Sequence, residues 1–108
     1  MNIINLAELY FRAFASKDLA QLKELLHTEV TLTDWNVDAK GRDEVLAQMS
    51  QIFIAFELIE VVPANIYNDK NTVIGELSIQ LDSERIKVVD IIKFSADLRI
   101  HSIQAFKG

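Results

Sequence analysis

The chain has 108 residues, with 11 Lys or Arg, 16 Asp or Glu, no Cys and a formal net charge of −5. Its length fits one domain over residues 1–108, and its apolar half is enough for a folded core. These figures exclude disulfide frameworks and thiolate metal sites, and they argue against nucleic acid as a partner. The N-terminus has no basic leader and no apolar run approaches the roughly 20 residues of a membrane span, which predicts a cytoplasmic protein without membrane contact.

Helical patterns occupy most of the first half of the chain. Apolar residues recur at helical spacing over residues 3–16, and again over residues 19–27. Asp18 precedes the second pattern and is a suitable N-cap, with a glutamine three residues later as in a capping box. A third helix is predicted over residues 43–56, with Asp43 as its cap.

The rest of the chain alternates with the period of a strand. Pro63 lies inside one of these segments, which predicts an edge strand or a bend at a bulge. Turn residues separate the segments from one another. We expect strands over residues 30–34, 58–67, 72–81, 86–94 and 98–106, and a loop over residues 35–40.

This order of elements predicts an α+β domain in which three N-terminal helices pack on one face of a curved, mostly antiparallel sheet. The short strand that follows the second helix joins the same sheet, since helices flank it on both sides. A curved sheet under helices makes a cone, and its interior is either filled with side chains or open as a ligand pocket.

Three polar side chains are predicted to point into this interior. Asp34 shares a strand face with two apolar residues, Asp90 lies in the middle of an apolar strand face, and Tyr10 lies on the apolar stripe of the first helix. The expected inner face carries no Lys or Arg near either acid. Desolvation is therefore expected to raise the pKa of Asp90.

Four phrases in order carry a resemblance to a known superfamily: YFRAFASKDLAQLKELL, VTLTDW, KGRDEVLAQM and VVDIIKFSADLRIHSIQAF. Together they make the chain similar to the nuclear transport factor 2-like proteins, which include SnoaL-like polyketide cyclases and ketosteroid isomerases. The resemblance extends over essentially the whole chain and implies a cystatin-like cone with an interior pocket. Three functional positions of the ketosteroid isomerases fall on Tyr10, Asp34 and Asp90, while Trp35 stands where that family has a proline.

The resemblance implies a catalytic role for each of these positions. Asp34 would be the base that removes a proton next to a carbonyl group, and Tyr10 with a protonated Asp90 would donate hydrogen bonds to the enolate oxygen. The implied reaction is an isomerisation or a cyclisation of an apolar or carbonyl-containing small molecule. No cofactor and no metal is expected, because no ligand cluster, phosphate loop or nucleophile motif is present.

Other residues are expected to contact the ligand, and each polar candidate also has a purely structural interpretation. Asp34 could cap a turn, Asp90 could be satisfied by a buried tyrosine, and Trp35 could simply close the cone. His101 shares a predicted face with apolar residues and could be a core histidine. His27 is expected at the C-terminus of the second helix, where its side chain would interact favourably with the helix dipole. The expected ligand contacts are Trp35, Phe14, Met49, Phe53 and His101.

The outer sheet face carries a predicted interface. Val89 and Ile91 stand between Lys87 and Lys93 on that face, and an apolar centre with a polar rim is typical of a contact surface. We expect a homodimer through this face. Two further functions stay open: a ligand-binding module without catalysis, and a dimerisation domain of the same fold.

Overall fold

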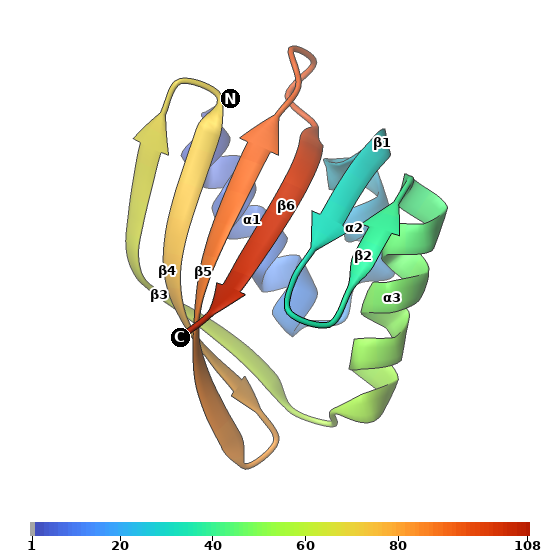
Figure 1. Ribbon diagram of the computed structural model, residues 1–108, viewed down its shortest axis with the longest axis vertical. Coiled ribbons are helices and arrows are strands. Elements are labelled where there is room, and N and C mark those ends of the chain that lie inside the picture. Colours follow the sequence, from blue (N-terminus) through green and yellow to red (C-terminus); the bar gives the residue numbers. More distant parts are fainter. Residues whose placement is uncertain (1) are drawn as a thin grey trace.

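The computed structural model describes residues 2–108 and contains three helices and a single six-stranded sheet (Figure 1). The predicted α+β architecture is confirmed. Within this range, no helix is long and apolar enough to cross a membrane. The elements in chain order are α1 (Ile3–Ala15), α2 (Leu19–Leu25), β1 (Leu26–Thr33), β2 (Asp38–Lys40), α3 (Arg42–Ala55), β3 (Ile59–Asp69), β4 (Thr72–Leu81), β5 (Glu84–Phe94) and β6 (Ile100–Lys107).

The sheet is mixed and open, with strand order β2-β1-β6-β5-β4-β3. Every neighbouring pair is antiparallel except β1 and β6, which run parallel. The strand that follows α2 therefore joins the common sheet, as the sequence predicts. Its position between β2 and β6 brings the end of β1 close to the last strand of the chain.

All three helices lie on the same face of the sheet (Figure 1). The core fills the space between these two layers, and Leu22, Leu26, Met49 and Ile92 are completely buried in it. Burial of four such side chains contributes several kcal/mol, since each apolar side chain of this size adds about 1.5–3 kcal/mol. The opposite face of the sheet carries no helix in residues 2–108.

The helix ends confirm one predicted cap and correct another. The Asp18 side chain accepts a hydrogen bond from the Gln21 N–H at 3.1 Å and caps α2. Asp43 is not the cap of α3, because the helix begins one residue earlier, after Gly41, and no side chain caps it. Asp43 instead lies in the first helical turn, where its negative charge interacts favourably with the positive end of the helix dipole.

The extent of α2 was also predicted wrongly at its C-terminus. The helix ends at Leu25, because Leu26 already belongs to β1 and pairs with Ile100 of β6. His27 is therefore a strand residue and does not interact with a helix end. Tertiary strand pairing overrides the local helical pattern here.

The structure tests three further strand predictions. β3 is an edge strand, and its register with β4 shifts between Pro63 and Asn65, which confirms both readings of the proline. The predicted loop at 35–40 contains the short strand β2, which pairs with β1 through Ala39 and Leu32. β6 begins at Ile100, since Leu98 adopts a positive φ of 62° in the preceding turn.

Candidate active site

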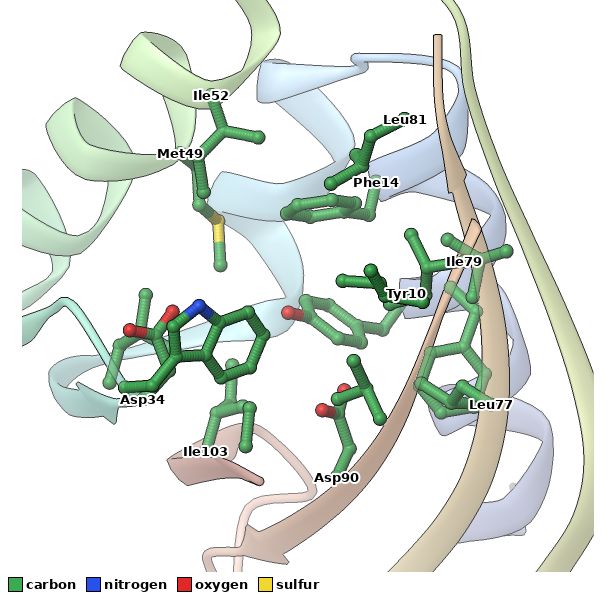
Figure 2. A pocket seen from close by; sticks show the side chains of 17 residues that line it. Tyr10, Phe14, Asp34, Met49, Ile52, Leu77, Ile79, Leu81, Asp90 and Ile103 are labelled. Carbon is green, nitrogen blue, oxygen red and sulfur yellow. The ribbon is translucent and has the colours of Figure 1, made fainter. Parts of the chain in front are cut away.

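A cavity of about 110 Å³ lies between the helices and the inner face of the sheet (Figure 2). The interior of the predicted cone is therefore open. Its walls are apolar except for Tyr10, Asp34, Asp90 and the indole N–H of Trp35. The remaining lining residues are Phe11, Phe14, Leu32, Met49, Ile52, Val61, Leu77, Ile79, Leu81, Ile86, Val88, Ile103 and Ala105.

Tyr10 reaches the cavity from the buried stripe of α1, and the side chain is only 5% exposed. Its ring packs against those of Phe11 and Phe14, with centroid distances of 5.7 and 6.3 Å. Figure 2 shows its hydroxyl directed into the cavity. Burial, together with the charges of Asp90 and Asp34, raises the pKa of Tyr10 well above its ordinary value. The hydroxyl therefore keeps its proton and is a hydrogen-bond donor at neutral pH.

Asp90 lies in the middle of β5 and is 7% exposed. Its cross-strand neighbours are two small residues, Gly75 of β4 and Ala105 of β6. Burial, reinforced by the charge of Asp34, raises the pKa of Asp90 from 3.8 to about 7. The predicted direction of this shift agrees with the structure.

Within residues 2–108 the Asp90 carboxyl group makes no side-chain hydrogen bond, with Tyr10 or any other residue, and its oxygens are not among the fully buried atoms without a partner, so they are accessible from the cavity. The alternative interpretation, in which Asp90 has a purely structural hydrogen bond with a buried tyrosine, is therefore wrong. Tyr10 and Asp90 each leave their hydrogen-bonding capacity available to a molecule in the cavity. A few polar groups that open into an otherwise apolar cavity are typical of a binding site.

Asp34 follows β1 directly and has two roles in the geometry. Its Oδ1 accepts hydrogen bonds from the N–H groups of Asn36 and Val37, both at 2.7 Å, and so holds the following turn. The same side chain lines the cavity (Figure 2). The turn-capping interpretation is therefore correct, but it occupies only Oδ1 and leaves Oδ2 for another partner.

Three of the five expected ligand contacts line the cavity: Phe14, Met49 and Trp35. Trp35 is 44% exposed, and the Lys107 ammonium lies 5.9 Å from the centroid of its ring. Phe53 is not part of the wall. It lies behind Phe14, with the two rings edge to face at 5.0 Å, and supports the wall from the core.

The expectation for His101 is wrong. Lys93 pairs with Ser102 and Phe94 with Ile100, so the residue between them has no cross-strand partner and forms a bulge. The bulge reverses the alternation, and His101 becomes exposed on the outer face, with its ring 5.2 Å from that of His27.

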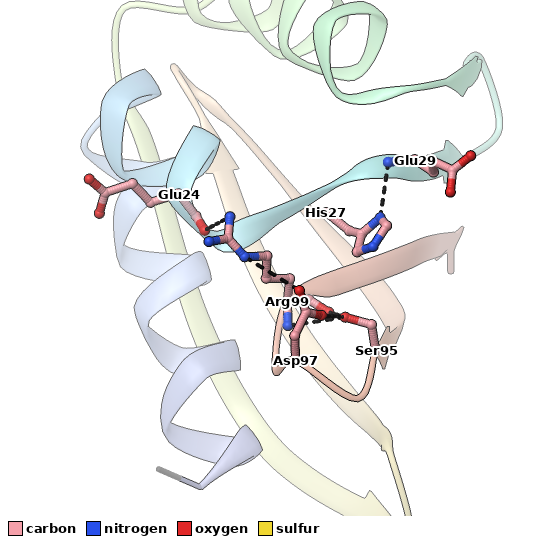
Figure 3. Close-up of polar contacts among 6 residues, drawn as sticks. All are labelled: Glu24, His27, Glu29, Ser95, Asp97 and Arg99. Carbon is pink, nitrogen blue, oxygen red and sulfur yellow. Dashed lines mark hydrogen bonds and ion pairs between the residues drawn. The ribbon is translucent and has the colours of Figure 1, made fainter.

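The neighbourhood of His27 is organised by local polar contacts (Figure 3). The Nδ1 atom of His27 accepts a hydrogen bond from the Glu29 N–H at 3.0 Å. In the adjacent turn the Ser95 hydroxyl bonds to Asp97, which lowers the pKa of this carboxyl group, and Arg99 pairs with Asp97 at 3.7 Å. No group of three potential metal ligands occurs in residues 2–108.

Sequence reasoning missed the long apolar wall that the outer strands contribute. Val61 of β3 and Ile86 of β5 line the cavity together with three residues of β4, namely Leu77, Ile79 and Leu81. The β4 residues alternate on one face in the sequence, and this signal was sufficient to place them on the inner face. The cavity therefore extends along β4 away from the three polar groups.

The helical layer, the open sheet and the polar groups inside an apolar cavity define the class of cone-shaped α+β proteins with an interior pocket. Residues 7–103 match the sequence model of the SnoaL-like domain family, and the chain belongs to this family. Comparison with curated protein sequences found no match.

Several solved structures share the fold. An NTF2-like protein of unknown function from Cytophaga hutchinsonii has a TM-score of 0.87 at 13% identity, over 100% of this chain and 91% of that one. A candidate isomerase of the SnoaL-like family from Agrobacterium tumefaciens has a TM-score of 0.84 at 13% identity, over 97% and 96%. A candidate SnoaL-like polyketide cyclase from Shewanella denitrificans has a TM-score of 0.85 at 15% identity, over 98% and 90%.

Proposed function

We propose that the protein binds a small carbonyl compound in this cavity and transfers a proton at the carbon next to the carbonyl group. The observation that carries the proposal is the convergence of Tyr10, Asp34 and Asp90 on one otherwise apolar cavity. The candidate isomerase and the candidate polyketide cyclase among the similar structures support an isomerisation or a cyclisation.

Each group has a distinct part in the proposed reaction. The free oxygen of Asp34 removes the α-proton, and the electron pair of the C–H bond moves to the carbonyl oxygen to form an enolate. The Tyr10 hydroxyl and the protonated Asp90 carboxyl donate hydrogen bonds to that oxygen, where negative charge develops. Asp34 then returns the proton to a different carbon, or the enolate carbon attacks a second carbonyl group and closes a ring.

The size of the cavity restricts the ligand. An apolar cavity of about 150 Å³ holds one benzene molecule, and this cavity measures about 110 Å³. The buried part of the substrate is therefore at most the size of one six-membered ring. A steroid does not fit unless most of it lies outside, past Trp35.

Isomerisation of cyclohex-3-enone to the conjugated cyclohex-2-enone tests the proposal, because the product absorbs in the ultraviolet and the ring matches the cavity. We expect turnover by the native chain and a loss of roughly 10²–10⁴-fold in Asp34→Asn, the range of a missing general base. The asparagine keeps an Oδ1 that can accept from the Asn36 and Val37 N–H groups, so the turn is preserved.

Asp34→Ala is the matched comparison, because it removes both the base and the turn cap. We expect equal losses of activity in the two variants but a lower thermal stability only in the alanine variant. Equal activity of Asp34→Asn and the native chain would exclude Asp34 as the base. The protein would then be a ligand-binding module without catalysis, and the only role of Asp34 would be to cap the turn.

A further inference from the structure

We propose that the cavity also binds small organic cations, such as methylated ammonium ions, with Asp34 and Asp90 as counter-charges and aromatic rings as its walls. This inference does not rest on the proposed function. It concerns a second class of ligand. A cation would bind to the cavity when Asp90 is ionised, whereas the proposed carbonyl reaction requires Asp90 to be protonated.

The first argument is the charge of the walls. Two carboxyl groups line the cavity, and no Lys, Arg or His among residues 2–108 lines it with them. Asp90 is 7% exposed and without a hydrogen-bond partner, and it is directed into the cavity (Figure 2). A carboxylate in apolar surroundings is costly unless a cation pairs with it. The described residues place no such cation in the cavity wall, so a ligand cation gains from both acids.

The second argument is the aromatic composition of the same walls. The rings of Tyr10 and Phe14 lie side by side at 6.3 Å, and Trp35 also lines the cavity. Aromatic faces attract cations, and aromatic cages are a common way to recognise quaternary ammonium groups. The Trp35 ring already accepts the ammonium of Lys107 at 5.9 Å. A tetramethylammonium ion is comparable in size to benzene, which puts it at the upper limit for a cavity of about 110 Å³.

The two classes of ligand require opposite protonation states. The titratable groups that face Asp90 are Tyr10 from α1 and Asp34 from the end of β1, while Gly75 of β4 and Ala105 of β6 contribute none. Tyr10 stays protonated, while Asp90 changes its charge near neutral pH. With the pKa of Asp90 raised to about 7, cation binding strengthens as the pH rises, and binding of an enolate or phenolate oxygen weakens.

Calorimetric titration with tetramethylammonium chloride tests the inference, with tert-butanol as an uncharged ligand of similar shape. We expect tetramethylammonium to bind roughly tenfold more tightly at pH 8 than at pH 6, following the ionised fraction of Asp90, and tert-butanol to show no such change. Asp90→Asn should weaken tetramethylammonium binding at pH 8 at least tenfold. Asp69→Asn removes an exposed acid at the end of β3 and should leave the affinity unchanged.

A second ligand separates this inference from the proposed function. 4-Nitrophenolate mimics the enolate, and Tyr10→Phe should weaken it at least tenfold while changing tetramethylammonium binding little. Asp90→Asn should do the reverse, because the asparagine amide still donates a hydrogen bond but carries no charge. Each proposal can therefore fail while the other stands.

Three results would overturn the cation site: equal binding of tetramethylammonium and tert-butanol at pH 8, an affinity that does not rise with pH, or unchanged binding by Asp90→Asn. Circular dichroism establishes whether the variants fold. If Asp90→Asn does not fold, the pH series and the tert-butanol comparison on the native chain decide the question.

Discussion

At the scale of single residues, Asp90 lines the candidate site, and its burial there has a cost in stability. Its pKa is raised from 3.8 in the unfolded chain to about 7 in the folded protein, mainly by burial. The folded state therefore holds the proton more tightly. The corresponding stabilisation is complete below the unfolded pKa and is lost as the pH rises through the folded pKa. The ionised form of Asp90 therefore destabilises the fold above pH 7. Binding sites often have such a cost in stability, because a group that is placed to bind a ligand has no partner while the ligand is absent.

This linkage predicts how Asp90→Asn changes stability. Between pH 5 and pH 8 the native chain should lose roughly 2–3 kcal/mol of unfolding free energy through Asp90 alone, and the asparagine variant should not. Urea denaturation of both proteins at the two pH values measures the difference. Asp69→Asn is the control, and its pH dependence should follow that of the native chain. The same loss in Asp90→Asn would show that Asp90 does not carry this proton.

Asp34 shows how a functional and a structural interpretation can both hold for one side chain. One carboxylate oxygen holds the turn through Asn36 and Val37, and the cavity is lined by the same group. Strand alternation predicts the direction of this side chain, since burial alternates along β1 from Val30 to Thr33, after a register shift earlier in the strand. The turn itself brings Trp35 to the cavity, and no periodic signal in the sequence predicts that position.

At the scale of elements, the sequence predicts a site residue where its strand is regular and fails where the strand is interrupted. Tyr10 and Asp90 lie within an unbroken helix and an unbroken strand face, so their periodicity is sufficient to place them. His101 lies at a bulge that depends on the pairing of β5 with β6, and such pairing is not encoded in local alternation. The short strand β2 escaped prediction for a similar reason, because its pairing with β1 is a tertiary contact.

β4 offers a test of how tightly the helical layer packs on the sheet. A Cβ atom on Gly75 would lie 3.1 Å from the Phe11 ring and 3.2 Å from Leu77, which is closer than ordinary contact. Gly75→Ala should therefore displace Phe11 and lower the unfolding free energy by about 1–3 kcal/mol. Gly108→Ala is the matched control, since its nearest neighbour would be 3.7 Å away. Thermal unfolding of the two variants compares them, and equal melting temperatures would contradict close packing at Gly75.

At the scale of the whole molecule, the three helices and the cavity lie on one face of the sheet, and the other face is uncovered (Figure 1). Val89 is half-buried on this outer face and stands between Glu76 of β4 and Phe106 of β6. Phe106 is 54% exposed, although it is a large aromatic residue. We propose that a second copy of the chain covers this face, as the alternation of β5 predicts, because an apolar centre within a polar rim favours association.

Sedimentation velocity at about 50 μM tests this proposal, and we expect the native chain to sediment as a dimer. Val89→Lys places a charge at the centre of the apolar face and should yield monomers, because association would have to remove the ammonium from water. Ile54→Lys introduces the same charge on α3, on the opposite side of the molecule, where the isoleucine is 86% exposed. This variant should remain dimeric. A native chain that is monomeric at this concentration contradicts the dimer, and dissociation by Ile54→Lys but not by Val89→Lys would move the interface to the helical layer.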